Sequence, residues 1–249
     1  MSVGPDTRAA PRKHGVLYLI PTHLSAPTAD NTASVLPTAV VTTAARLNHY
    51  IAENAKTARA FLKAIGVSRP LAEISIVELD KHARSGDVTL LLAPLFRGED
   101  VGLVSEAGAP AVADPGALVV AAAHSADIVV KPLVGPSSLL MALMASGLNG
   151  QSFAFHGYLP QERAARSKQI QTFEQDSRAR TTTQMFIETP YRNQALLIDL
   201  AATLAPGTRL CIATDLTGEL EWVCTRPVSA WRQSLPPLAK LPTMFLFLA

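Results

Sequence analysis

The chain alternates short apolar runs with segments in which apolar residues recur every three or four positions. Residues 15–20 and 101–104 are apolar without a polar residue at every second place, which is typical of strands buried on both faces of a parallel sheet. Residues 53–66 instead carry apolar side chains at i, i+3, i+4 and i+7, which predicts a helix. This repeated alternation predicts an α/β fold with right-handed crossovers.

Three parts are expected along the chain. Residues 1–13 lack periodicity and predict a flexible tail. Residues 14–150 predict an N-terminal α/β domain, and residues 151–249 a C-terminal α/β domain. Within these parts, residues 23–37 are rich in Ser, Pro and Thr and predict a long loop, and residues 155–160 predict a linker between the domains.

Charge, cysteine content and motif content exclude several classes of protein. Lys and Arg number 22 against 20 Asp and Glu, so bulk charge does not predict nonspecific nucleic-acid binding. Two cysteines and the absence of HExxH or a Cys/His cluster predict neither a disulfide framework nor a metal site. Pro and Gly interrupt the uncharged stretch 132–161, and the first residues contain no long apolar run, so we expect no membrane span, no signal peptide and a cytoplasmic location.

Three loops that follow expected strands are built mostly of small residues: 21–22, 106–110 and 135–138. Ligands of open α/β sheets bind beyond the carboxyl ends of the strands, and small side chains let a ligand approach the backbone. The sequence has no G-x-G-x-x-G, no P-loop and no G-x-S-x-G. A site without a phosphate cradle or a nucleophile suits a cofactor that is itself the reactive electrophile.

The loop after the strand at 101–104 carries a family resemblance. Residues 103–110 (LVSEAGAP) and 113–116 (ADPG) resemble the L-V-S-D-A-G-T-P and D-P-G segments of the bacterial 16S ribosomal RNA (cytidine-2'-O)-methyltransferase I family, a branch of the tetrapyrrole (corrin/porphyrin) methylases. Four further segments resemble that family in the same order: 52–59, 134–138, 157–160 and 186–192. The similarity therefore covers residues 15–249.

The resemblance implies a two-domain tetrapyrrole-methylase-like fold with S-adenosylmethionine in a cleft between the domains, a homodimer, and methylation of a ribose 2'-hydroxyl in ribosomal RNA. It implies that the cofactor contacts Pro21, Gly108, Ala109, Ser137, Ser138, Ile187 and Thr243. It offers as acceptor-side residues Glu53, Arg59, His82, Glu188, Tyr191 and Arg192. A ribose hydroxyl must lose its proton to a base within hydrogen-bond reach, and the sequence does not identify that base.

Departures from the family pattern leave alternatives open. The family's first loop, P-T-P-I-G-N, lacks its Gly-Asn pair here, its Asp and Thr are replaced by Glu106 and Ala109, and no basic C-terminal extension follows the last expected strand. Lost Arg and Lys contacts weaken phosphate binding, so RNA specificity is the property these changes affect. The alternatives are carbon methylation of a tetrapyrrole and a cofactor-binding module that has lost turnover. Individual residues also have structural readings: Glu53 as a charge at a helix N-terminus, and Arg192 as the start of a helix.

Overall fold

The computed structural model describes residues 13–26, 29–79 and 85–249 and divides into two compact units. The N-terminal unit contains residues up to 23 and 27–136, and the C-terminal unit contains residues 24–26 and 137–249. This boundary differs from the expected one at residue 150. Helix α7 (Ser138–Ser146) packs on strands of the C-terminal unit, which places it there rather than with the strands that precede it.

The N-terminal unit is built on a parallel sheet with strand order β3-β2-β4-β1-β5. All of its strand pairs are parallel, so the carboxyl ends of all five strands lie along one edge. This confirms the parallel α/β fold that the alternating pattern predicts. The strands are β1 (Val16–Ile20), β2 (His49–Ala52), β3 (Ser75–Glu78), β4 (Val101–Val104) and β5 (Val129–Pro132).

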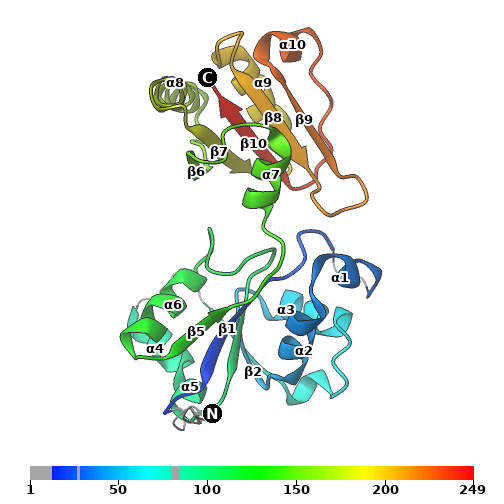
Figure 1. Ribbon diagram of the computed structural model, residues 1–249, viewed down its shortest axis with the longest axis vertical. Helices are drawn as coiled ribbons and strands as arrows, with labels where there is room; N and C mark the ends of the chain where they lie inside the picture. Colours follow the sequence, from blue (N-terminus) through cyan, green and yellow to red (C-terminus); the bar gives the residue numbers. More distant parts are fainter. Residues whose placement is uncertain (1–12, 27–28, 80–84) are drawn as a thin grey trace, which may run out of the picture. The chain divides into compact units, whose positions relative to one another are not determined.

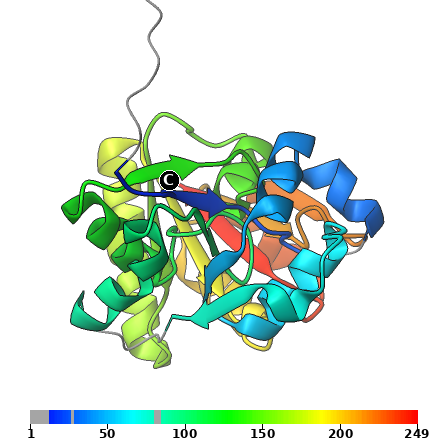
Figure 2. The ribbon, with the colours of Figure 1, turned by 90° about the horizontal axis from the view of Figure 1, so that it is seen from below.

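Helices cover both faces of this sheet (Figures 1 and 2). On one face lie α1 (Ala29–Val35), α2 (Thr38–Arg46) and α3 (Ala55–Ala64); on the other lie α4 (Ser85–Leu91), α5 (Ala93–Phe96) and α6 (Gly116–Ser125). A 3₁₀ turn spans Leu71–Glu73. Helix α1 lies inside the segment expected to be a loop, so that expectation was wrong there. Among the side chains described in and directly after this helix, Val35 and Leu36 contribute to the core, too few residues for a helical period to show.

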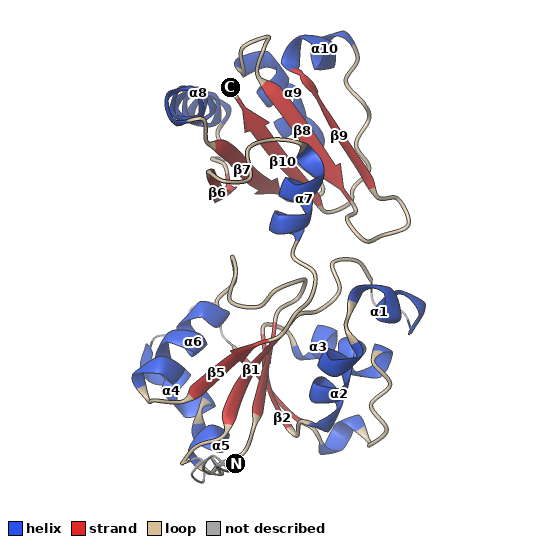
Figure 3. Ribbon diagram, viewed as in Figure 1, coloured by secondary structure: helices blue, strands red, loops and turns tan. Residues whose placement is uncertain are grey.

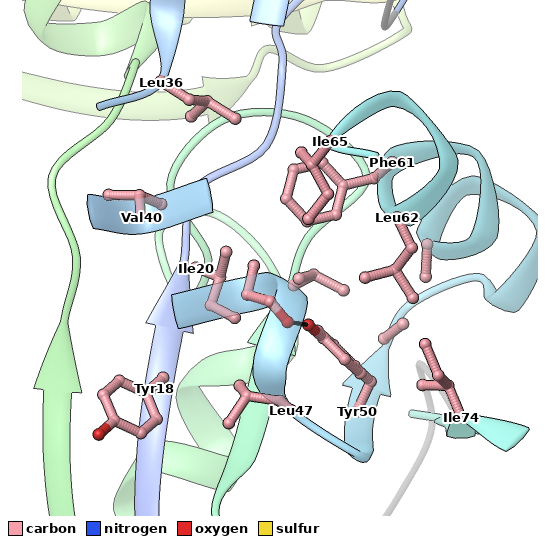
Figure 4. Close-up of a cluster of buried hydrophobic side chains, with 14 of the residues drawn as sticks. Tyr18, Ile20, Leu36, Val40, Leu47, Tyr50, Phe61, Leu62, Ile65 and Ile74 are labelled. Carbon is pink, nitrogen blue, oxygen red and sulfur yellow. Dashed lines mark hydrogen bonds between the residues drawn. The ribbon is translucent and has the colours of Figure 1, made fainter. Parts of the chain in front are cut away.

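The core of the N-terminal unit follows the pleat of β1. Tyr18 and Ile20 pack in the cluster with α2 and α3 (Figure 4), and Leu17 packs in the cluster with α4, α5 and α6. The Tyr50 hydroxyl donates to the carbonyl oxygen of Ala44 at 2.5 Å, which joins β2 to α2. Burial raises the pKa of Tyr50, so the phenol stays protonated and remains a donor.

The C-terminal unit contains a mixed sheet with order β6-β7-β10-β8-β9. Strands β6 and β7 are parallel, β10 runs antiparallel to β7 and β8, and β9 runs antiparallel to β8. Strand β6 occupies most of the expected linker at 155–160, so that expectation was also wrong. The strands are β6 (Phe153–Tyr158), β7 (Thr183–Glu188), β8 (Arg209–Thr214), β9 (Trp222–Pro227) and β10 (Thr243–Leu248).

Helices also cover both faces of this second sheet (Figure 3). Helix α7 packs on β8, β9 and β10. The opposite face is covered by α8 (Arg163–Arg180), α9 (Asn193–Thr203) and α10 (Val228–Gln233). No helix in the described part of the chain has the length and apolar character needed to cross a bilayer.

Candidate functional site

The loops after β1 and β4 are joined by backbone hydrogen bonds at the carboxyl edge of the first sheet. The N–H of Thr22 donates to the carbonyl oxygen of Gly108 at 2.9 Å, and the N–H of Gly108 donates to the carbonyl oxygen of His23 at 3.4 Å. Gly108 has φ +71°, a left-handed conformation that favours glycine. The Ser105 hydroxyl also donates to the Gly108 carbonyl at 3.0 Å. These bonds hold Gly108 in a fixed position at the edge.

The loop after β5 lies against the loop after β1 at the same edge of the sheet. A Cβ atom built on Gly135 would lie 2.4 Å from the Cβ of Pro21, far inside van der Waals contact. The small-residue loops after β1, β4 and β5 therefore lie together, and we call residues 21–23, 53–54, 105–110 and 133–136 the N-terminal rim.

Acidic side chains brace the rim. Glu53, after β2, accepts a hydrogen bond from the backbone N–H of Glu106 at 3.2 Å. Asp114 accepts from the N–H of Ala111 at 2.9 Å and from the N–H of Gly116 at 2.7 Å. Burial, with a smaller contribution from the charge of Glu53, raises the pKa of Asp114 to about 6. Asp114 thus holds the turn that follows the β4 loop, in which Ala111 has φ +65°.

His23 occupies the altered first loop and is buried. Its Nε2 lies 2.8 Å from the Thr32 hydroxyl oxygen, and its ring makes an edge contact with Phe61. Its Nδ1 has no hydrogen-bond partner among the described residues. Burial lowers the pKa of His23, so the neutral imidazole is the form that fits this loop.

The C-terminal unit has its own edge, where β7 and β8 end and β9 and β10 begin. The strand register aligns Glu188, Thr243, Thr214 and Trp222 side by side across four strands. The neighbouring register row, Ile187, Met244, Ala213 and Val223, belongs to the apolar cluster on the α7 face. We call these two rows, with residues 189–192 and 240–242, the C-terminal rim.

An ion pair between a buried carboxylate and a half-buried arginine lies at the C-terminal rim. The Glu188 carboxylate accepts from Arg192 Nη2 at 2.6 Å, from Arg192 Nε at 3.0 Å and from the N–H of Thr189 at 2.6 Å. The Glu188 side chain is only 2% exposed. The adjacent Tyr191 is 79% exposed, and the Lys240 ammonium lies 5.2 Å from the centre of its ring. Arg192 is therefore committed to Glu188, whereas Tyr191 and Lys240 face solvent.

The structure gathers most residues predicted for the site into the two rims. Pro21, Gly108, Ala109 and Glu53 lie at the N-terminal rim. Ile187, Glu188, Tyr191, Arg192 and Thr243 lie at the C-terminal rim. Ser137 occupies the N-cap position of α7 without a side-chain capping hydrogen bond, and Ser138 is the first residue of the helix.

Besides Ser137 and Ser138, which lie at the start of α7, two further predicted residues are not placed in either rim. Arg59 lies on the exposed side of α3, and His82 lies outside the described residues. The sequence reading missed Asp114, Thr214, Trp222 and Lys240. Asp114 stood in the quoted D-P-G segment, but Trp222 and Thr214 are brought together only by the antiparallel pairing of β8 with β9, which leaves no local motif. No group of three or more His, Cys, Asp and Glu side chains in the described ranges could hold a metal ion.

Comparison with known proteins identifies the relatives of the chain. No model of a known protein family matches it. The ribosomal RNA small subunit methyltransferase I of Synechocystis sp. is 33% identical over 82% of this chain and 67% of its own length. The protein of that name from Escherichia coli O157:H7 is 30% identical over 90% of this chain and 74% of its own length.

The fold has solved neighbours as well. The X-ray structure of cobalt precorrin-4 methyltransferase, a cobalamin biosynthetic enzyme, aligns with a TM-score of 0.55 at 11% identity over 94% of each chain. This likeness confirms the tetrapyrrole-methylase-like fold. The first relatives in sequence are aligned over 60 to 67% of their own lengths. With identities of 30% and above across most of this chain, the chain belongs to the ribosomal RNA small subunit methyltransferase I family.

Proposed function

We propose that the chain transfers a methyl group from S-adenosylmethionine to a ribose 2'-hydroxyl of ribosomal RNA. One observation carries the proposal: the segment 103–116, by which the sequence resembles this family, forms the rim where the loops after β1 and β5 also meet. The names of the relatives supply the acceptor class. Such an enzyme needs a rim that leaves backbone groups accessible beside small side chains, and this rim has that character.

The residues at the rims fit S-adenosylmethionine. Ala109 is half-buried and has a minimal side chain, so a ligand can approach its backbone, which suits the polar tail and ribose of the cofactor. The N–H and carbonyl of Gly108 are bonded to His23 and Thr22, and they hold this loop in place. Ile187 is a half-buried member of its row and offers an apolar contact suited to a flat purine, while Met244 and Ala213 beside it are buried. We assign to the cofactor Pro21, Gly108, Ala109, Ser137, Ser138, Ile187 and Thr243. When bound, the cofactor supplies a methyl group already activated on a sulfonium.

The protein's own task is to hold the acceptor hydroxyl in line with the methyl group and to exclude other orientations of the acceptor. Glu53 is fixed by the Glu106 N–H, which holds its carboxylate at the rim. The exposed ring of Tyr191 can stack on a nucleobase. Arg192, paired with Glu188, acts as a positioning residue for the segment that carries Tyr191. Arg59 and His82 remain predictions for the acceptor side, and the base that takes the hydroxyl proton stays unassigned.

A labelled-methyl assay tests the proposal. Small-subunit ribosomal RNA lacking its native modifications and a reduced tetrapyrrole are offered separately with labelled S-adenosylmethionine. We expect label in the RNA alone. Label in the tetrapyrrole alone would replace the proposed acceptor with the alternative that the fold neighbours suggest.

Cofactor binding is measured independently by thermal denaturation. Cofactor at a hundred times its Kd stabilises the folded chain by about 2.7 kcal/mol. Stabilisation without label in either acceptor would indicate a module that binds cofactor but has lost turnover. No stabilisation by S-adenosylmethionine or its demethylated product would refute the enzyme readings.

We further propose that the chain acts in the cytoplasm as a homodimer, as the family resemblance implies. Sedimentation equilibrium of the full chain tests the dimer, and a mass equal to one chain at micromolar concentration would refute it.

A further inference from the structure

A pocket of about 250 Å³ opens within the C-terminal unit beside its rim. Thr214, Leu220 and Trp222 form one wall, at the β8–β9 hairpin. The other wall is the segment between α10 and β10, residues 236–241, which we call the proline strap. None of the side chains assigned above to the cofactor lines this pocket.

Hydrogen bonds fix both walls before any ligand binds. The N–H of Leu238 donates to Gln194 Oε1 at 2.8 Å, and Asn193 Nδ2 donates to the carbonyl oxygen of Leu241 at 2.8 Å. On the opposite wall, the N–H of Leu220 donates to Asp215 Oδ2 at 2.9 Å. A ligand entering a preformed pocket loses less free energy to the ordering of protein groups.

The lining has the chemistry of an aromatic-ligand site. Trp222 is 38% exposed, and its ring is held by an edge contact with the buried Trp231. Prolines, leucines and Ala239 supply the remaining apolar surface, and Thr214, whose hydroxyl lies 3.2 Å from that of Thr243, is the polar side chain of the lining. This combination accommodates a flat ring with a polar edge.

The segments that line the pocket carry both signs of charge: Lys240 in the proline strap, and the exposed Glu219 and Glu221 in the hairpin. Lys240 is exposed, lies in the proline strap and has its ammonium over Tyr191. The hairpin also carries Glu221, whose carboxylate accepts from the backbone N–H of Thr217 at 2.6 Å. An exposed ammonium beside an aromatic pocket is complementary to a nucleotide, which joins a flat base to an anionic phosphate.

We propose that this pocket binds one unpaired nucleobase of the RNA substrate, stacked on Trp222, with the neighbouring phosphate on Lys240. This inference rests on the proposed function, because it names a binding site for the RNA acceptor. Unpaired RNA bases are recognised by stacking on aromatic side chains, whereas paired bases are not accessible to a pocket.

Trp222 itself reports on the binding. The chain has two tryptophans, and Trp231 is 1% exposed, so quenching by a bound base acts mainly on Trp222. The full chain is titrated with a short single-stranded oligoribonucleotide of mixed sequence, and with the same sequence as a duplex. We expect the single strand to quench the fluorescence and the duplex to leave it unchanged.

Variants separate stacking from packing. Trp222→Leu keeps apolar volume but removes the stacking ring, and we expect RNA affinity, measured by filter binding, to fall about 5- to 150-fold. Trp222→Phe keeps a ring and should bind within a few-fold of the parent. Ile198→Ala, at a 44% exposed position on α9, is the control and should bind normally. Thermal denaturation checks that each variant is folded.

Lys240→Ala tests the phosphate contact. We expect weaker binding and a salt dependence of log K that is shallower by about 0.7, the value for one phosphate contact on a single strand. Lys168→Ala, which removes an exposed lysine from α8, should leave the slope unchanged. If Trp222→Leu does not fold, the quenching of Trp222 in the unaltered chain still tests the stacking, and Lys240→Ala still tests the phosphate contact.

Three results would overturn the inference: RNA affinity unchanged in both Trp222→Leu and Lys240→Ala, equal quenching by duplex RNA, or quenching of Trp222 by S-adenosylhomocysteine alone. The last would assign the pocket to the cofactor. The proposed function fails by a different result, namely that the unaltered chain transfers no label to ribosomal RNA. Where label transfer is present, we expect Trp222→Leu to raise KM for RNA and leave kcat unchanged.

Discussion

Arg166 and Asp199 form a buried ion pair between α8 and α9 that also holds the chain after β6. Arg166 Nε donates to Asp199 at 2.8 Å and Nη2 donates at 2.5 Å, while Nη1 donates to the carbonyl oxygens of Pro160 at 2.9 Å and Gln161 at 2.8 Å. The Arg166 and Asp199 side chains are 11% and 5% exposed. One guanidinium thus fixes residues 160–161 against two helices.

Arg166→Ala should destabilise the fold by about 3–5 kcal/mol, because it leaves a buried carboxylate without its main partner. Urea denaturation measures the change in the free energy of unfolding. Arg163 offers a matched control: it contacts the same carboxylate at 3.0 Å but is 72% exposed. Arg163→Ala should cost less than about 1 kcal/mol. Equal losses from the two variants would contradict the burial argument.

Gly135→Ala should disturb the N-terminal rim. The added Cβ would lie 2.4 Å from the Pro21 Cβ, which belongs to a rigid ring, so the β1 and β5 loops must move apart. We expect a loss of about 1–3 kcal/mol in unfolding free energy and a weaker thermal shift with S-adenosylhomocysteine. Gly150→Ala is the control, since nothing lies within 4 Å of its added Cβ. A normal thermal shift in Gly135→Ala would show that the contact does not shape the site.

The sequence predicted several strands and helices of the N-terminal unit because their signals are local. Strands such as β4 are buried on both faces and read as unbroken apolar runs, and the 3.6-residue period of α3 is visible in Ala58, Phe61 and Leu62. The family membership was also predicted, from segments that stand in the same order as in the relatives, and it is confirmed.

The parts that were missed depend on pairings between distant residues. Strand β6 does not read as a buried strand in the sequence, because a glycine and a histidine interrupt its apolar run, and its side chains are mostly half-exposed in the structure. The C-terminal rim arises where β10, the last strand, inserts between β7 and β8, so that Thr243 lies beside both Glu188 and Thr214. No pattern within a single segment encodes that insertion.

Asp114→Asn should change how stability depends on pH. Burial raises the pKa of Asp114 from 3.8 to about 6, so between these values the folded chain keeps a proton that the unfolded chain has lost. The stabilisation from this proton is complete below about pH 3.8 and is lost as the pH rises through about 6. The amide does not titrate. The stability of the parent relative to Asp114→Asn should therefore increase as the pH falls from 7 to 4.5.

Urea denaturation at several pH values measures this difference. Glu106→Gln is the control, since Glu106 is exposed and substitution there should leave the pH dependence in place. A stability difference that grows as the pH rises would instead mean that the backbone hydrogen bonds to Asp114 outweigh its burial and favour the charged form.

Arg192 and Glu188 should be strongly coupled. The Glu188 side chain is 2% exposed and accepts two hydrogen bonds from Arg192, so Arg192→Ala leaves a buried charge unpaired. We expect about 3–5 kcal/mol of destabilisation from that single change, and a clearly smaller loss when Glu188→Gln is added, because the amide removes the unpaired charge. A double-mutant cycle in urea measures the coupling. The Arg192→Ala variant also decides whether Arg192 only pairs with Glu188 or contacts the RNA. Because its guanidinium is held by Glu188, we expect the variant to leave the salt dependence of RNA binding unchanged. A slope shallower by about 0.7 would show that Arg192 contacts a phosphate.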